Sequence, residues 1–127
     1  GVNIAGHVAA LAALRDGQEW LDQALAYLQG NRDFVSDYIR ENMPAIRMFS
    51  VEATYLAWLD CRNALLPQNP ADFFLKQARV GLNDGAEFGR GGENHVRLNF
   101  ACSRKLLAQA LDRMKKALKT AGSDPLS

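Results

Sequence analysis

One arginine, Arg97, lies in the middle of an apolar run and has the clearest chemical use of any residue in this sequence. The run, residues 95–100, otherwise predicts a β-strand. A guanidinium stays charged at any working pH, and its planar fork of N–H donors matches a carboxylate or a phosphate. The position therefore indicates that Arg97 either forms an ion pair with a nearby Asp or Glu on the sheet or binds a small carboxylate ligand. The spacing alone leaves both interpretations open.

A glycine-rich loop precedes this strand, with glycines at positions 85, 89, 91 and 92. Such a loop either folds tightly or lets a ligand approach the backbone. The segment Gly89-Arg-Gly-Gly92 does not follow a strand and open a helix, so it predicts neither a dinucleotide-binding fingerprint nor a P-loop. A flexible turn is the simpler interpretation.

The remaining candidates for chemistry form no complete catalytic set. His7 and His95 are the only histidines, and since neither has a nucleophile beside it in sequence, we expect local hydrogen-bonding roles. Cys61 and Cys102 lack C-x-x-C spacing, which argues against zinc and predicts buried, reduced thiols. No lysine lies in an apolar setting that would favour Schiff-base chemistry; the lysines are at positions 76, 105, 115, 116 and 119.

The composition predicts one globular domain. The 127 residues are 48% hydrophobic and 23% charged, and the net charge of +1 comes from 15 basic and 14 acidic residues scattered along the chain. We therefore expect no nucleic-acid partner. Without a long apolar run or a basic leader, we expect no membrane span and no signal peptide, and a cytoplasmic location. The chain opens on Gly1 rather than methionine and runs straight into a helical pattern, which indicates a fragment of a longer polypeptide.

Two helices are predicted before the first proline. Residues 4–15 are apolar on nearly every face, which predicts a helix buried on several sides. Asp16 and Glu19 have the spacing of a capping box, so we expect the second helix to begin there and to run to Asn42. Pro44 disfavours helical backbone at the residue before it and supplies the stop.

The period then changes from helical to extended. Strands are predicted at residues 46–50, 54–60, 80–82 and 95–100. Asp72 is the expected cap of a short helix and Ser103 the cap of the last one, which Gly122 and Pro125 end. The predicted fold class is α+β, a short, mostly antiparallel sheet with helices packed on one side, preceded by a long helix.

A set of short motifs resembles one family: Asn3-Ile4, Glu19-Trp-Leu-Asp22, Tyr27-Leu-x-Gly-Asn31, Thr54-Tyr-Leu-Ala-Trp-Leu-Asp60, Ala78-x-Val-Gly-Leu-Asn-Asp-Gly85, Phe88-Gly89 and Arg97-Leu-Asn-Phe-Ala101. The family is the fold-type-I, class I/II aminotransferase-like group of enzymes that use pyridoxal 5′-phosphate (PLP). Within it the chain is similar to the MalY/PatB-type cystathionine β-lyases, which include proteins called aminotransferase B. The resemblance covers nearly the whole chain.

The resemblance implies that residues 1–15 lead from a missing large domain and that residues 16–127 form the small C-terminal domain. Arg97 matches the arginine that binds the substrate α-carboxylate in this family, and it is the only site residue implied here. The lysine that carries PLP belongs to the large domain, so no catalytic, cofactor-binding or metal-binding residue is expected in this chain. Two departures stand out: Ala53 where the family usually has glycine, and Asn94-His95 in place of a glycine and an aromatic residue.

The function implied by the resemblance is that of a C-terminal domain in a PLP-dependent enzyme. The parent is either a C–S β-lyase, acting on cystathionine or cysteine conjugates, or an aminotransferase, and a homodimer is expected. The fragment alone is not expected to be active. The alternative is a stand-alone module that binds small carboxylates or a protein partner without catalysis.

Overall fold

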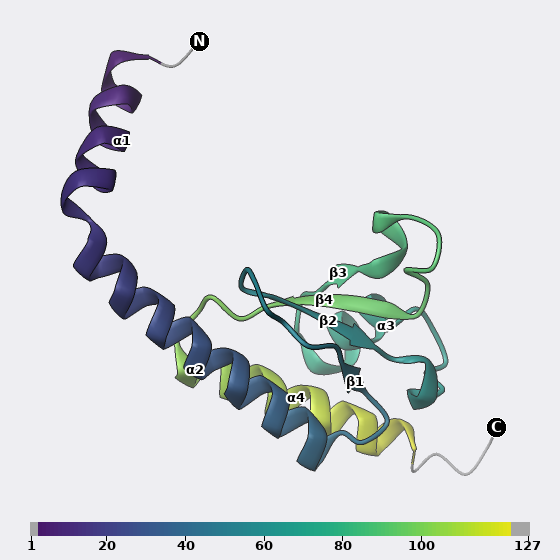
Figure 1. The fold of residues 1–127 in the computed structure, drawn as a ribbon. Coiled ribbons are helices and arrows are strands. Elements are labelled where there is room, and N and C mark those ends of the chain that lie inside the picture. The colour runs from purple at the N-terminus through teal and green to yellow at the C-terminus, as the bar shows by residue number, and fades with distance from the viewer. Residues whose placement is uncertain (1–2, 123–127) are drawn as a thin grey trace.

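The computed structural model describes residues 3–122 and shows a long helical arm leading into an α+β body (Figure 1). The long helices are α1 (Ile4–Asp16), α2 (Gln18–Asn42) and α4 (Arg104–Ala121). The strands are β1 (Arg47–Met48), β2 (Leu56–Asp60), β3 (Asn83–Asp84) and β4 (His95–Asn99). The short helical turns are η1 (Arg62–Ala64), α3 (Pro70–Phe73), η2 (Phe74–Ala78) and η3 (Gly85–Phe88).

The four strands form one antiparallel sheet in the order β1-β2-β4-β3. Alternate residues of the two central strands are buried; these are Ala57, Leu59, Val96 and Leu98. They join one core with side chains of α2, α3, η2 and α4, so all these helices cover the same face of the sheet. The predicted α+β class, with its antiparallel sheet and one-sided helices, is confirmed. The other face carries Trp58 and Arg97, which pair across β2 and β4.

The junction between the first two helices differs from the prediction. Asp16 is the last residue of α1, and its carboxylate accepts hydrogen bonds from Arg15 rather than capping α2. Gly17 stands between the helices and donates its N–H to the carbonyl of Ala13 at 2.9 Å. A Cβ at Gly17 would lie 2.4 Å from that carbonyl oxygen, so only glycine permits the close turn.

The predicted burial of the first helix is wrong for this chain. No residue of α1 is buried, and the side chains of Ile4 and Leu14 are 85% and 87% exposed. The reason is geometric: α1 projects away from the body and continues the line of α2 after a bend (Figure 1). Its apolar character therefore does not contribute to the core of the described residues.

The strand predictions were right in number but wrong at their ends. β2 begins at Leu56 rather than at residue 54, because Thr54 has a positive φ of 67° and cannot continue an extended strand. The strand predicted at 80–82 lies at Asn83–Asp84, and the strand predicted at 46–50 is reduced to Arg47–Met48. Strand ends depend on where the backbone meets a partner strand, and local composition does not encode this.

The helix caps were predicted better near the C-terminus than in the middle of the chain. Ser103 caps α4 by accepting the N–H of Leu106 at 3.3 Å, and Gly122 follows α4, as predicted. Asn69, not Asp72, caps α3, because Pro70 occupies the first helical position and Asn69 accepts the N–H of Ala71 at 2.8 Å. Pro125 lies outside the described residues.

A buried asparagine fastens the end of the sheet to the helices. Asn31 donates from Nδ2 to the carbonyls of Phe100 and Cys102, at 2.8 and 2.9 Å, and accepts from Arg104 Nε at 2.7 Å. Since Asn31 belongs to α2, these bonds fix the connection between β4 and α4 against that helix. Cys61 is buried and Cys102 is partly buried, and both are free thiols.

Among residues 3–122, no helix is long and apolar enough to cross a membrane. Within the same residues, no cluster of three or more His, Cys, Asp or Glu side chains could hold a metal ion.

Candidate functional site

Arg97 stands at the centre of the sheet face that the helices leave open. On β4 it pairs with Trp58 of β2 on one side and with Asn83 of β3 on the other. Its Nη2 donates to Asn83 Oδ1 at 3.2 Å, and its Cζ lies 4.4 Å from the centroid of the Phe88 ring. The side chain is partly buried, with its guanidinium between an amide and an aromatic ring.

The guanidinium of Arg97 keeps its charge uncompensated within the described part of the chain. No Asp or Glu among residues 3–122 forms an ion pair with it. Its Nε is buried and has no hydrogen-bond partner there. A buried donor without an acceptor costs about 1–3 kcal/mol, and more when the group is charged. Of the two interpretations from sequence, the internal ion pair therefore does not form, and the arrangement suits an external anion.

Aromatic rings cover the open face from β1 to Arg97, in the order Phe49, His95, Trp58 and Phe88; we call these four residues the ring column. The centroids of Phe49 and His95 are 6.3 Å apart, and those of His95 and Trp58 are 5.6 Å apart, both pairs stacked. Phe88 meets Trp58 edge-on at 5.7 Å. The column ends on the guanidinium of Arg97, which lies over the Phe88 ring.

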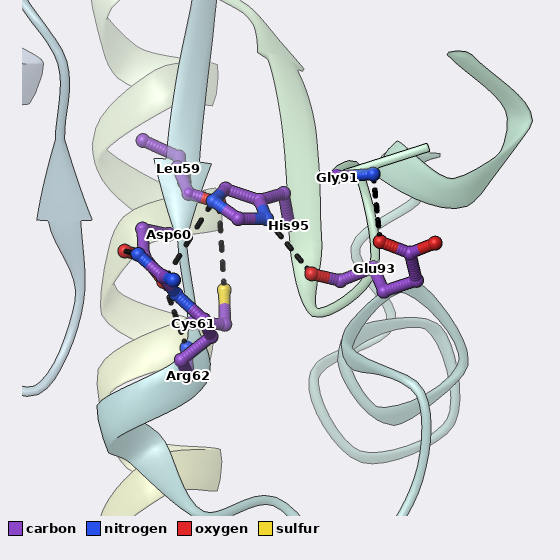
Figure 2. Close-up of polar contacts among 7 residues, drawn as sticks. All are labelled: Leu59, Asp60, Cys61, Arg62, Gly91, Glu93 and His95. Atoms are coloured by element: carbon purple, nitrogen blue, oxygen red, sulfur yellow. Dashed lines mark hydrogen bonds and ion pairs between the residues drawn. The ribbon is translucent and has the colours of Figure 1, made fainter. Parts of the chain in front are cut away.

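His95 is buried in the ring column. Both of its ring nitrogens make polar contacts (Figure 2). Its Nδ1 lies 2.8 Å from the carbonyl oxygen of Glu93, and its Nε2 lies 3.8 Å from Asp60 Oδ1. The predicted hydrogen-bonding role of His95 is confirmed. In place of the family's aromatic residue, the imidazole also supplies a stacking surface between two rings. His7 lies on exposed α1, far along the chain from this site.

Asp60 is bound more tightly by Arg62 than by His95. Its carboxylate accepts from Arg62 Nη2 at 2.6 Å, from Arg62 Nε at 2.9 Å and from the Arg62 backbone N–H at 3.0 Å (Figure 2). These hydrogen bonds lower the pKa of Asp60 to about 2. Burial and the nearby Asp60 charge raise the pKa of the Cys61 thiol to about 12, so Cys61 is not a nucleophile.

The glycine-rich loop folds tightly and presents Phe88 to Arg97. The backbones of Gly85 and Gly92 touch: a Cβ on Gly85 would lie 2.2 Å from the carbonyl oxygen of Gly92. Asn94 has a positive φ of 59°, which accounts for the glycine that the resembled family usually has there, since asparagine tolerates this region better than most residues. The loop is therefore closed by backbone contact between Gly85 and Gly92.

The lysines lie on the other layer of the molecule. All lie on η2 or α4, helical elements on the face of the sheet opposite Arg97; Lys76 pairs with Asp72 at 3.9 Å and Lys115 donates to Asn42 Oδ1 at 2.7 Å. None of the four strands contains a lysine. The residues of the open face therefore fit the carboxylate of an amino acid but offer no amine to carry PLP.

Sequence reasoning identified Arg97 but missed its neighbours. Asn83, Trp58 and Phe88 come from three other segments, and only strand register and loop closure bring them to the guanidinium. In the sequence, Trp58 stands out only as one aromatic residue of the strand predicted at residues 54–60. The sequence did contain a signal for the position of Trp58. Side chains alternate along a strand, which places Trp58 on the face opposite Ala57 and Leu59.

The chain is similar to PLP-dependent enzymes in sequence and in structure, although no family model matches it. It is 40% identical to a candidate cystathionine β-lyase of Mycobacterium leprae, over 89% of this chain and 31% of that protein. It superimposes on a candidate PLP-dependent β-cystathionase of Corynebacterium diphtheriae with a TM-score of 0.89 and 43% identity, over 94% and 32% of the two chains. The PLP-bound C–S lyase of Staphylococcus hominis gives a TM-score of 0.87 and 30% identity, over 98% and 33%.

These matches confirm the resemblance and the fold: the chain has an α+β architecture that matches part of fold-type-I PLP enzymes. Its relatives are cystathionine β-lyases, such as PatB of Bacillus subtilis at 34% identity, and aminotransferases, such as an aspartate aminotransferase of Pyrococcus horikoshii at 28%. The chain spans about a third of the length of the curated relatives it matches.

Proposed function

We propose that this chain is the small C-terminal domain of a PLP-dependent C–S β-lyase or aminotransferase, and that Arg97 binds the α-carboxylate of its amino-acid substrate. Residues 1–15 would lead from the large domain, and residues 16–127 would form the small one. The observation that carries the proposal is the Arg97 guanidinium, which is charged, unpaired with any described acid, and directed by neutral neighbours on the open face of the sheet.

The contribution of Arg97 is orientation rather than proton transfer. Two charge-assisted hydrogen bonds to a carboxylate, each worth about 1.5–3 kcal/mol, would fix the rotation of the substrate about its α-carbon. The bond to be broken is then held at one angle to the cofactor plane, which lowers the entropic part of the barrier. PLP, bound by the parent enzyme, would supply the electron sink for the electron pair left on the α-carbon.

The first prediction concerns Arg97→Ala in the full-length protein. We expect KM for amino-acid substrates to rise about 100-fold, with a smaller loss of kcat, because two charge-assisted hydrogen bonds are removed. Arg97→Lys should recover only part of the loss, since an ammonium cannot bind both carboxylate oxygens in one plane. Steady-state kinetics measure both.

Arg47→Ala is the matched control, because Arg47 lies 5.1 Å over the ring of Phe49 at the other end of the ring column. Its kinetics should stay close to those of the unmodified protein. If Arg97→Ala also left KM unchanged, Arg97 would not bind the substrate carboxylate.

Lyase and aminotransferase activities leave different products. The names of the M. leprae and S. hominis relatives favour C–S lyase activity, and we propose cystathionine and related thioethers as the first substrates to try. Pyruvate release from cystathionine would identify a lyase, whereas keto-acid exchange without pyruvate would identify an aminotransferase. Light scattering of the full-length protein would test the homodimer that the resemblance implies.

A further inference from the structure

We propose that Phe88 is a positioning residue for Arg97: its ring holds the guanidinium in the orientation that receives the substrate carboxylate. This inference rests on the proposed carboxylate-binding role of Arg97. The Arg97 Cζ lies 4.4 Å from the centroid of the Phe88 ring, within the range of a cation–π contact. Phe88 itself is 51% exposed, so its ring is not simply filling the core.

A neutral ring suits this task better than an acidic partner would. A carboxylate beside Arg97 would orient it but would also occupy the N–H donors and cancel the charge that the substrate needs. The ring attracts the cation through its quadrupole and leaves it charged. Asn83, the other contact of the guanidinium, is also neutral and takes one N–H of Nη2. Arg97 is thus restrained from two sides without being neutralised.

Phe88 is in turn fixed by its surroundings. Its ring meets the edge of Trp58 at 5.7 Å, and Trp58 is stacked on buried His95 at 5.6 Å. Its backbone belongs to η3, which Asp84 caps by accepting the N–H of Ala86 at 3.0 Å. Restraint of both the ring and the backbone is what a positioning residue requires, because a mobile ring could not define the direction of a long arginine side chain.

The inference is tested by comparing two ligands that differ only in the carboxylate. L-alanine and ethylamine both present an amine, but only L-alanine can use Arg97. Dissociation constants would be measured on the full-length, PLP-loaded protein from the initial change in cofactor absorbance after rapid mixing, before any conversion of L-alanine. We expect Phe88→Leu to weaken L-alanine binding about three- to tenfold, the range of a partly desolvated cation–π contact, and to leave ethylamine binding unchanged.

Two further variants separate the ring from the shape of the side chain. Phe88→Tyr retains the aromatic face and should bind L-alanine as the unmodified protein does. Phe49→Leu removes the ring at the far end of the ring column, next to Arg47 rather than Arg97, and should also leave L-alanine binding unchanged. Thermal unfolding of each variant would confirm that the fold persists.

A double-mutant cycle with Arg97→Ala distinguishes the two proposals. In the Arg97→Ala background, Phe88→Leu should cause no further loss of L-alanine affinity. If Arg97→Ala weakened L-alanine binding while Phe88→Leu did not, the positioning role would be wrong and the proposed function would stand. If Arg97→Ala had no effect, the proposed function itself would fail. Equal weakening of L-alanine and ethylamine by Phe88→Leu would also overturn the positioning role, since it would show a general structural effect.

Discussion

Single charged residues on the open sheet face are used in two opposite ways. Asp60 is closely paired, with Arg62 Nη2 2.6 Å from its carboxylate, and its charge serves the fold. Arg97, two residue pairs further along the same face, has only an amide and a ring as neighbours, and its charge remains available to a ligand. The difference lies in the neighbours rather than in the residue types, because both side chains are ionised at neutral pH.

The pairing of Asp60 predicts an acid-dependent loss of stability. Its folded-state pKa of about 2 lies below the unfolded value of about 3.9, so its contribution is complete above about pH 4. As the pH falls from about 4 to about 2, the unfolded chain takes up a proton on Asp60 while the folded protein still holds the carboxylate ionised, so the contribution is lost. Equilibrium urea unfolding at a series of pH values would measure it.

Asp60→Asn provides the comparison, because it cannot titrate. The stability advantage of the unmodified protein over this variant should be constant above about pH 4 and should shrink between about pH 4 and pH 2. Arg62→Ala should reduce the same pH dependence, since hydrogen bonding to Arg62 is the largest cause of the shift. A difference between the unmodified protein and Asp60→Asn that did not vary with pH would contradict the assignment.

Among the elements, the loop from η3 to β4 has the strictest steric requirement. Gly85 and Gly92 bring their backbones together, and an added Cβ on either would lie within 2.2 Å of a carbonyl oxygen of the other. This contact closes the loop that carries Phe88 and aligns the start of β4. The geometry of the candidate site therefore depends on two residues that have no side chains.

Gly85→Ala should consequently destabilise the protein by about 1–3 kcal/mol, the cost of overpacking a tight contact. It should also weaken amino-acid binding, because η3 must shift and take Phe88 with it. Urea unfolding and the L-alanine titration described above measure the two effects.

Gly81→Ala is the matched control. A Cβ at Gly81 would meet no atom within 4 Å, so its stability should change by less than about 0.5 kcal/mol. Equal effects of the two substitutions would show that the close contact of Gly85 and Gly92 does not matter.

Over the whole molecule, the functional groups are divided between two layers. Arg97 and the ring column occupy the open face of the sheet, whereas every lysine lies in the helical layer behind it. Helix α1 projects from this body (Figure 1). Its apolar side chains are exposed. The proposed amino-acid site would therefore have one half, the Arg97 guanidinium, on this open face.

This division predicts how the isolated chain responds to PLP. Because no lysine faces Arg97, the 127-residue chain should show no saturable Schiff-base absorbance with added PLP, and L-alanine should not alter its spectrum. The full-length protein should show both responses. Absorbance titrations of the two proteins side by side are the measurement.

A stoichiometric absorbance band in the isolated chain, responsive to L-alanine, would contradict the proposed division of the site between two domains. Surface lysines can react weakly with any aldehyde, so saturation at one equivalent is the deciding feature.

Local sequence patterns determined the order and type of most elements. The apolar stripe of α4 and its Ser103 cap, the stop of α2 before Pro44, and the two central strands follow from periodicity and turn chemistry. These features depend on residues a few positions apart, which the chain specifies directly. The same local patterns predicted that Arg97 lies on a strand, and its residue type made it the candidate for binding an anion.

The tertiary structure alone decided what surrounds that arginine. Whether Arg97 would meet an acid or a ring depended on the register of three strands and on the closure of a loop by two touching backbones. The tertiary structure also decided that β2 begins only after Thr54 and that α1 lies outside the core. Contacts between distant segments arise from the packing of the whole chain, so a local pattern can assign a side chain to a face but cannot choose its neighbours.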